Sequence, residues 1–305
     1  MLRDRWAFIN GEFVPWESAT IHLMSHSLSR GSAIFEVLSF HETPRGPAVF
    51  RLDRHVERLF RTASMLYMTI PLTEHATQQA ILATVKRNRL TSGVIKVICY
   101  FHQVSFDILA PQQPLDFCVV AVDPINDFDR HNASRASGIT ACVCRWRKLH
   151  PDTVPVEAKV AANYLSGMVA NLEAKKRGFD LGIMLDTEGY IAEGGTESVF
   201  LVKDGVLMTP SLGNVLHGIT RRSILEIAQH TGMEVREDRL RAEAFINADE
   251  VFVASTNRKI SPVTRIDGHP LPTAPGPITS RLQQILQSIC SGADQRFQDW
   301  LFPVE

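Results

Sequence analysis

The feature that most constrains the fold is a polar, turn-rich stretch at residues 123–137 (DPINDFDRHNASRAS), which separates two segments of mixed strand and helix patterns. Domain boundaries usually fall in stretches of this composition, because few contacts cross them. We therefore expect a smaller N-terminal α/β domain at residues 1–122, a linker at 123–137 and a larger mixed domain at 138–305. The fold class that follows is α/β, or more broadly α+β, in two domains.

The first segment begins with a candidate β-hairpin at residues 6–14, because Asn10-Gly11 suits a two-residue turn between strands. Residues 52–67 carry apolar side chains at helical spacing, and Asp53 is a candidate N-cap. The other expected elements of this segment are a strand at 33–40, a helix at 75–88 and strands at 94–101 and 116–122.

The second segment is also mixed. Its longest helical pattern covers residues 161–177 and stops at Gly178, a residue type common just after helices. The other expected elements are strands at 138–145, 181–185, 198–202, 206–209 and 250–254 and a helix at 221–230. The tail at 295–305 carries Trp300, Leu301 and Phe302, so we expect it to pack on the body of the protein.

Charge and composition exclude several function classes. The 305 residues include 32 Lys and Arg against 33 Asp and Glu, which gives a net charge of −1 and no basic excess for a nucleic acid. The N-terminus has no apolar signal segment, and nowhere do 18 apolar residues follow one another. We expect small-molecule chemistry, with no nucleic acid and no membrane.

The five cysteines indicate a reducing compartment. Their number is odd, and four of them lie in apolar, strand-like runs, which predicts buried, reduced thiols and a cytoplasmic location. Cys142 and Cys144 are spaced C-x-C on one strand, which is not a zinc-binding pattern, and no metal site is expected.

Lys159 is the first candidate for chemistry. It lies in PVEAKVAANY, an otherwise apolar stretch just before a helix. Burial lowers the pKa of a lysine, and the neutral amine is a nucleophile that can form a Schiff base with an aldehyde cofactor. Taken alone, the pattern is explained more simply by a lysine that reaches the surface with its charged end.

Two further segments could bind a phosphate. Gly218, Ile219 and Thr220 stand at a helix start, where backbone N–H groups and the helix dipole favour an anion. Ser255 and Thr256 follow a strand in a turn rich in hydroxyl groups. Each segment is weak evidence by itself, but two phosphate sites and one poised lysine fit pyridoxal phosphate, which needs both.

Two charged residues complete the candidates for a cofactor site. Glu193, followed by two glycines, could keep a pyridine nitrogen protonated, although an isolated Glu-Gly-Gly is more often a solvated loop. Arg58, in the helix pattern RLDRHVERLF, could clamp a phosphate, and an i,i+4 ion pair on a solvated helix face is an equally good interpretation.

Several segments together resemble the class IV, or fold type IV, pyridoxal-phosphate aminotransferases, and most closely the bacterial branched-chain aminotransferases. The resemblance covers most of the chain in the family's order, through these segments: FINGEFVPWESATIHLMSHSLSRGSAIFE, GPAVFRLDRHVERL, AKVAANYLSGMVANLEAKKRGFD, GYIAEGGTESVFLVKDGVLMTP, LHGITRRSI and EVFVASTNRKISPV. It implies a two-domain fold with the cofactor between the domains. It also implies a homodimer in which a loop of the partner closes the active site.

The resemblance assigns roles residue by residue. Lys159 matches the Schiff-base lysine and proton shuttle, Glu193 the partner of the pyridine nitrogen, and Tyr164 the tyrosine at the phenolic oxygen. Leu216 matches the apolar residue packed on the cofactor ring. The residues that match the phosphate site are Arg58, Ile219, Thr220, Ser255 and Thr256. The implied reaction is a ping-pong transfer of an amino group from an amino acid to a keto acid, 2-oxoglutarate in the branched-chain enzymes.

The substrate side departs from the family pattern. Branched-chain enzymes usually carry tyrosine where this chain has Arg30, tyrosine and arginine where it has Val94 and Lys96, and two small residues where it has Asn257 and Arg258. Phe35 remains a candidate pocket wall. Arg30, Lys96 and Arg258 could add cations around a substrate carboxylate, and each could instead point to solvent or pair with an acidic neighbour.

Three functions therefore stay open at this level. The first is an aminotransferase for branched-chain or other apolar L-amino acids. The second is a D-amino-acid aminotransferase, because stereochemistry depends on which side of the site holds the carboxylate. The third is a pyridoxal-phosphate lyase of the aminodeoxychorismate type, which shares the fold and needs no keto-acid acceptor.

Overall fold

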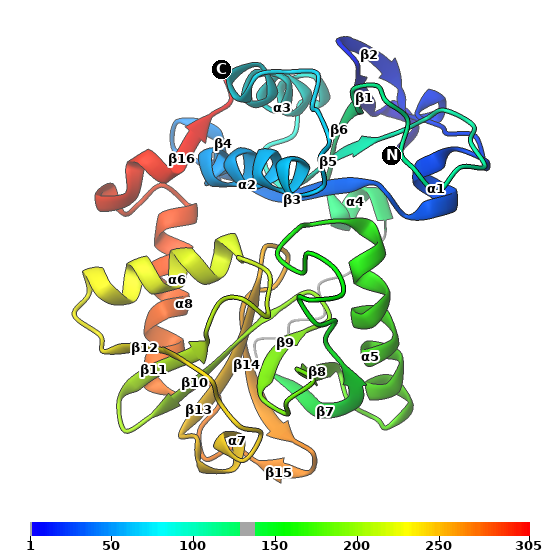
Figure 1. The fold of residues 1–305 in the computed structure, drawn as a ribbon. Helices are drawn as coiled ribbons and strands as arrows, with labels where there is room; N and C mark the ends of the chain where they lie inside the picture. Colours follow the sequence, from blue (N-terminus) through cyan, green and yellow to red (C-terminus); the bar gives the residue numbers. More distant parts are fainter. Residues whose placement is uncertain (1, 129–137) are drawn as a thin grey trace. The chain divides into compact units, whose positions relative to one another are not determined.

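The computed structural model describes residues 2–128 and 138–305, which fall into two compact units (Figure 1). The first unit contains residues 2–128, 158–162 and 288–305, and the second contains residues 138–157 and 163–287. This grouping differs from the expected boundaries, because the segment around Lys159 and the C-terminal tail both belong to the first unit. Residues 129–137 of the expected linker lie outside the described residues.

The described part of the first unit is built on a seven-stranded sheet in the order β16-β4-β3-β5-β6-β1-β2, with every neighbouring pair antiparallel. Its strands are β1 (Trp6–Ile9), β2 (Glu12–Pro15), β3 (Ile34–Thr43), β4 (Gly46–Phe50), β5 (Gly93–Tyr100), β6 (Asp116–Val122) and β16 (Leu301–Pro303). The hairpin predicted at Asn10-Gly11 is confirmed, since both residues have positive φ, 49° and 100°, as its tight turn requires.

One face of this sheet forms the core of the first unit. Ile34, Leu38 and Phe40 alternate along β3 with no exposed surface, and they pack in one cluster with apolar residues of the helices α2 (Leu52–Met65) and α3 (Glu74–Asn88). The side chains between them, such as Phe35 and Val37, are half-buried on the opposite face. A charged residue at a core-facing position of β3 therefore lies against α2.

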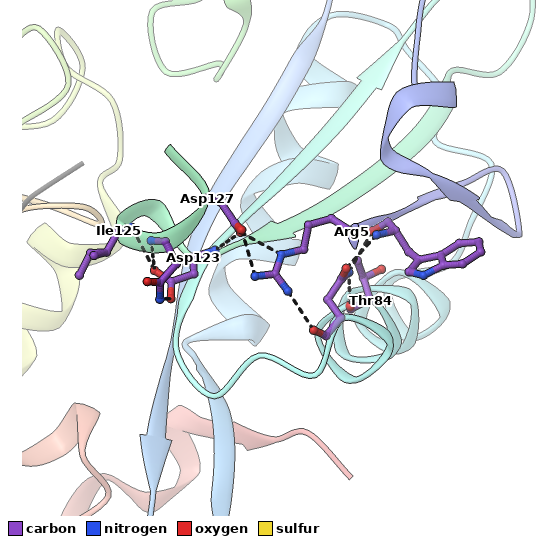
Figure 2. Close-up of polar contacts among 8 residues, drawn as sticks. Arg5, Thr84, Asp123, Ile125 and Asp127 are labelled. Carbon is purple, nitrogen blue, oxygen red and sulfur yellow. Dashed lines mark hydrogen bonds and ion pairs between the residues drawn. The ribbon is translucent and has the colours of Figure 1, made fainter. Parts of the chain in front are cut away.

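The short helix α4 (Pro124–Phe128) occupies the start of the expected linker and is fixed to the first unit (Figure 2). Arg5 donates from Nε and Nη2 to the two carboxylate oxygens of Asp127, at 2.9 and 3.0 Å, and from Nη1 to the carbonyl oxygen of Asn88 at 3.2 Å. One guanidinium thus joins α4 to the end of α3 next to β1. Residues 124–128 belong structurally to the N-terminal unit.

The described part of the second unit has nine strands, ordered β12-β11-β10-β13-β14-β7-β8-β9 with β15 beside β14. β9 also pairs with β10 at Ser198 and Glu193, so the strands from β10 round to β9 close into a ring. Its strands are β7 (Ile139–Arg147), β8 (Leu181–Leu185), β9 (Ile191–Gly194), β10 (Ser198–Lys203), β11 (Val206–Pro210), β12 (Val235–Asp238), β13 (Glu250–Ser255), β14 (Lys259–Ile266) and β15 (His269–Pro270).

Helices pack on the outside of this ring. α5 (Tyr164–Lys176), preceded by a 3-10 turn (Ala161–Asn163), lies along β7 and β8, and α6 (Ile219–His230) packs against β13. The remaining helices are the short α7 (Ala244–Asn247) and α8 (Pro277–Cys290). Gly167 of α5 approaches Gly195, which follows β9, so closely that a Cβ on Gly167 would stand 2.4 Å from the Gly195 carbonyl oxygen.

The C-terminal tail packs on the body of the first unit, as expected. A 3-10 helix (Gln295–Trp300) leads into β16, which pairs with β4. Trp300 is 8% exposed, and the guanidinium carbon of Arg51 lies 4.3 Å from its ring centroid. The backbone N–H of Arg51 also donates to the Trp300 carbonyl oxygen at 2.7 Å.

All five cysteines are buried free thiols, which confirms the prediction of buried, reduced cysteines. Burial raises the pKa of the Cys118 thiol to about 11, so this thiol stays protonated at neutral pH. Within residues 2–128 and 138–305, none of the helices combines the length and the apolar character that crossing a membrane would require.

Candidate active site

Lys159 is held by its own backbone in the first unit. Its carbonyl oxygen accepts from the N–H of Phe35 at 3.1 Å, and its N–H donates to Oγ1 of Thr62 at 3.1 Å. The next residue, Val160, forms a β-bridge with Ile34. The lysine is therefore fixed between β3 and α2 and is only 9% exposed, so it does not reach the surface as an ordinary lysine would.

Two other candidates gather around the Lys159 amine. The Phe35 ring centroid lies 4.9 Å from Nζ of Lys159 and 5.5 Å from Nζ of Lys96. Lys96 stands on β5 opposite Val37 of β3, on the face of the sheet that carries Phe35. Phe35 and Lys96 are thus brought together with Lys159, while Lys96 remains exposed.

Arg58 lies in a buried ion cluster on the other face of β3. Its Nε and Nη2 donate to Oε1 and Oε2 of Glu36, both at 2.7 Å, and Nδ1 of His55 lies 2.7 Å from Oε2 of Glu36. Glu36 is 1% exposed, His55 2% and Arg58 5%. The solvated i,i+4 interpretation of Arg58 is therefore wrong, because the guanidinium is buried and forms a two-bond pair with a strand carboxylate.

Burial and neighbouring charges set the protonation of this cluster. Burial opposes the charge of Glu36, but Arg58 and His55 outweigh it and lower the pKa of Glu36 to about 2. Burial also lowers the pKa of His55, against the opposing effect of Glu36, with Arg58 and Lys159 contributing in the same direction as burial. At neutral pH the cluster therefore holds an ionised Glu36 and a neutral His55 in the vicinity of Lys159.

Glu193 is positioned in the second unit by two contacts. Nζ of Lys148, which is itself buried, forms an ion pair with Oε1, and the backbone N–H of Leu216 donates to Oε2 at 3.3 Å. The carboxylate is only 12% exposed. It is therefore not a solvated loop glutamate.

Ser198 lies between the other candidate residues of the second unit. On β10 it pairs with Glu193 of β9 on one side and with Ala254 of β13 on the other. A Cβ added to Gly218, the N-cap of α6, would stand 2.9 Å from its hydroxyl oxygen. The start of α6, which carries Ile219 and Thr220, thus lies beside Glu193 and the end of β13, whose last residue is Ser255 and which Thr256 follows.

The turn after β13 is fixed by its own ion pair. The N–H of Arg258 donates to Oγ of Ser255 at 3.3 Å, and its Nε donates to Oε1 of Glu197 at 2.8 Å. Glu197 is 4% exposed and also accepts from the N–H of Thr196. Arg258 therefore pairs with an acidic neighbour, one of the alternatives that the sequence left open besides a position in solvent or at the substrate. Asn257 lies in the same turn.

Arg30 is engaged outside these clusters. Its Nη2 and Nε donate to the carbonyl oxygens of Phe106 and Asp107, at 2.7 and 3.2 Å. The residue ends the short helix α1 (His26–Arg30), and its side chain is exposed. Arg30 thus attaches the loop after β5 to α1. Tyr164 is the first residue of α5, directly after the 3-10 turn.

The residues that sequence reasoning missed are the partners of the candidates: Glu36, His55, Lys148, Glu197 and Ser198. Glu36 had a detectable signal, because it stands two residues from Ile34 and from Leu38, at a core position of a strand. A carboxylate at such a position needs a buried cation. Lys148 had no detectable signal in the sequence, because its partner Glu193 is 45 residues away and is brought near only by the order of the strands.

The residues present fit pyridoxal phosphate by their chemistry. The first unit offers a buried amine, and the second offers a largely buried carboxylate beside a helix start capped by a glycine without a side-chain cap bond. Nη1 of Arg258, next to the hydroxyl-rich turn, is buried without a hydrogen-bond partner among the described residues. An unsatisfied cationic donor, a helix N-terminus and hydroxyl groups suit the oxygens of an anionic ligand.

Comparison with known proteins agrees with this chemistry. Residues 33–266 match the family Amino-transferase class IV. The branched-chain-amino-acid aminotransferase of Salmonella typhimurium is 36% identical over 301 residues, which cover 98% of this chain and 97% of that protein. The chain therefore belongs to the class IV aminotransferases, and its cofactor is pyridoxal phosphate.

Solved structures show the same fold over the full length. The branched-chain aminotransferase of Thermoproteus uzoniensis, solved with norvaline, has a TM-score of 0.93 at 31% identity, with 99% of each chain covered. The branched-chain amino acid aminotransferase of Escherichia coli has a TM-score of 0.94 at 34% identity, also with 99% of each chain covered. The mixed α/β fold predicted from the sequence is confirmed as that of these aminotransferases.

Proposed function

We propose that this aminotransferase moves the amino group of a branched-chain or other apolar L-amino acid to 2-oxoglutarate by a ping-pong mechanism. The full-length similarity to enzymes named branched-chain aminotransferases supports the substrate class, as does norvaline, an apolar amino acid, in the Thermoproteus structure. The observation that carries the mechanism is Lys159, an amine fixed by its backbone and almost completely buried.

Lys159 is the catalytic residue of this proposal. Pyridoxal phosphate supplies an aldehyde carbon that takes up the amino group and a ring that withdraws electrons from the substrate Cα. Lys159 moves the proton between Cα of the substrate and C4′ of the cofactor. Because its backbone is bonded on both sides, to Phe35 and Thr62, only its side chain has to move between these atoms.

The other residues hold the cofactor in this proposal. Glu193, fixed by Lys148, keeps the pyridine nitrogen protonated. Tyr164 donates to the phenolic oxygen, and Leu216 packs on the ring. The phosphate is bound by hydroxyl groups, by the start of α6 and by a buried guanidinium: Ser255, Thr256, Ile219, Thr220 and Arg58.

The contacts of Arg30, Lys96 and Arg258, the three cations that depart from the branched-chain pattern, favour the L-amino-acid proposal over the D-amino-acid alternative. Arg258 is paired with Glu197 through Nε, and its buried Nη1 lies next to the hydroxyl-rich turn that we assign to the phosphate. Arg30 is engaged by two backbone carbonyls. Lys96 alone lies beside Phe35 and Lys159, where it can attract a carboxylate as a point charge. Phe35 and Lys96 are the substrate contacts we propose, with Arg30, Asn257 and Arg258 shaping the loops around them.

The experiment follows the visible spectrum of the purified enzyme with its cofactor. Addition of L-leucine should bleach the absorption band, and addition of 2-oxoglutarate should restore it. Lys159→Ala should fold, with an unchanged far-UV circular dichroism spectrum, but should lose the band and the turnover. Turnover by this variant at the wild-type rate would refute the role of Lys159.

The same measurement separates the alternatives. Bleaching by D-alanine and not by L-leucine would replace our proposal with the D-amino-acid function. A stable band with both donors, together with release of pyruvate from aminodeoxychorismate, would indicate the lyase.

We also propose a homodimer in the cytoplasm. Four large apolar side chains are more than half exposed in the loop after β5 (Val104, Phe106, Ile108 and Leu109), which supports association with a second copy. The five reduced cysteines support a reducing compartment. Sedimentation equilibrium of the purified protein tests the dimer.

A further inference from the structure

The buried cluster of Glu36, His55 and Arg58 contains two groups that the proposed function does not use, Glu36 and His55, and Glu36 carries a negative charge. Glu36 is an anion, and an anion next to a phosphate site opposes phosphate binding by simple charge repulsion. Its presence against Arg58 therefore calls for an explanation. Two are available: it only neutralises a buried guanidinium, or it sets the direction in which that guanidinium points.

The geometry favours the second explanation. The two 2.7 Å bonds run from Nε and Nη2 of Arg58 to the two oxygens of Glu36, so both partners are held in one plane. This uses the Nε–Nη2 edge of the planar guanidinium, so its Nη1 end points away from the Glu36 carboxylate. Arginine has several rotatable bonds, and a single contact would leave its fork free to turn.

The support behind Glu36 is equally fixed. Glu36 itself pairs with Val97 of β5, and the same strand, β3, pairs with β4 further along, at residues 40–43. Nδ1 of His55, one turn before Arg58 on α2, contacts the carboxylate from the same helix face. The carboxylate is 1% exposed, so water does not compete for it.

We propose that Glu36 is a positioning residue for the cofactor phosphate: it orients Arg58 so that the guanidinium binds the phosphate of pyridoxal phosphate. The inference rests on the proposed function, since it assumes that Arg58 binds this phosphate. It predicts a change in phosphate affinity opposite to the change that charge repulsion alone predicts. Removing the negative charge of Glu36 should weaken phosphate binding, whereas charge repulsion alone predicts that binding becomes stronger.

The test compares pyridoxal phosphate with pyridoxal, which lacks the phosphate, by fluorescence titration of the cofactor-free protein. The dissociation constant of pyridoxal divided by that of pyridoxal phosphate gives a ratio that measures the contribution of the phosphate to binding. A smaller ratio means that the phosphate contributes less. Glu36→Gln should reduce this ratio about tenfold, the size of one lost charged hydrogen bond, while the affinity for pyridoxal stays unchanged. A general loss of structure would weaken both ligands together.

The controls separate the two levels of the argument. Arg58→Met should reduce the ratio as much as Glu36→Gln, and the double variant should be no worse than Arg58→Met alone. Glu42→Gln, which changes an exposed carboxylate on the same strand, should have no effect. If Arg58→Met leaves the ratio unchanged, the proposed role of Arg58 fails and the inference fails with it.

Two outcomes overturn the inference alone. If Arg58→Met abolishes the phosphate preference but Glu36→Gln keeps or increases it, Glu36 only neutralises charge. Should Glu36→Gln not fold, Glu36→Asp decides, because it keeps the charge and shortens the side chain by one methylene. A reduced ratio with Glu36→Asp supports orientation, and a wild-type ratio refutes it.

Discussion

The contact between α5 and the loop after β9 makes a sharp prediction about Gly167. A Cβ at this position would stand 2.4 Å from the Gly195 carbonyl oxygen and 2.8 Å from the Gly195 Cα. Ordinary contact begins at 3.4 Å, so Gly167→Ala has to move one backbone segment by about 1 Å. Gly195 stands two residues after Glu193, and the displaced segment is therefore the one that carries the proposed pyridine partner.

Two opposing contributions decide whether Gly167→Ala raises or lowers the free energy of unfolding. Alanine is favoured over glycine inside a helix by about 1 kcal/mol. Overpacking costs about 1–3 kcal/mol, and the upper end applies here because the obstructing atoms are backbone rather than a flexible side chain. We expect a net destabilisation of about 2 kcal/mol, which lowers Tm by roughly 4–8 °C in a unit of this size.

Thermal unfolding of the cofactor-free Gly167→Ala variant measures the stability, and titration with pyridoxal phosphate measures the weaker binding that a displaced Glu193 should cause. Lys176→Ala, an exposed change on the same helix, is the matched control and should leave both quantities unchanged. A Tm at or above that of the wild type would refute the reasoning, because the helix would then be free to move away from Gly195.

Two further predictions concern stability. Glu36 has a pKa of about 2 in the folded protein against an ordinary value of 4.5, so it stabilises the fold above pH 4.5, and this contribution is lost as the pH falls towards 2. The lowered pKa of His55 acts in the same direction below pH 6.5. Urea unfolding between pH 2 and 7 should therefore show a free energy of unfolding that decreases as the pH is lowered, and the decrease should be smaller in Glu36→Gln. If the pH dependence of the variant were parallel to that of the wild type, the lowered pKa of Glu36 would be contradicted. Trp300→Ala should cost about 3–5 kcal/mol, as for other large buried aromatic residues, whereas Trp146→Ala, whose residue is 44% exposed, should cost far less in the same thermal assay.

Elements with a strong local signal could be predicted from the sequence. The Asn10-Gly11 hairpin and the helix that begins at Leu52 follow from neighbouring residues, and the structure confirms both. The burial of Lys159 does not, because the local pattern taken alone favours a lysine that reaches the surface, whereas the residue is only 9% exposed. The helix expected at 161–177 is observed as α5 (Tyr164–Lys176), with a 3-10 turn at 161–163 before it and Arg177 as its C-cap.

Features that depend on distant residues could not be predicted. Arg58 looked equally suited to a solvated helix face, because its partner Glu36 lies 22 residues away on a strand. The tail was expected to pack on the body, but its pairing with β4 gave no local signal, since strand partners are chosen by the whole sheet. The stereochemistry of the substrate belongs to the same class, because it depends on how Lys96 and its neighbours are arranged rather than on their identity.

The first unit is discontinuous along the chain, and this has a consequence for the order of folding during synthesis. Its sheet has no β16 until residues 301–303 have left the ribosome, and β3 has no bridge to Val160 until the middle of the chain has been made. Most of the second unit is synthesised between these two events. Domains nearer the N-terminus commonly fold first during translation, but here the unit that contains β1 also contains β16, which is made after every other described strand. The nascent protein must therefore protect the unpaired edge of β4 from association with other chains until residues 301–303 have been made.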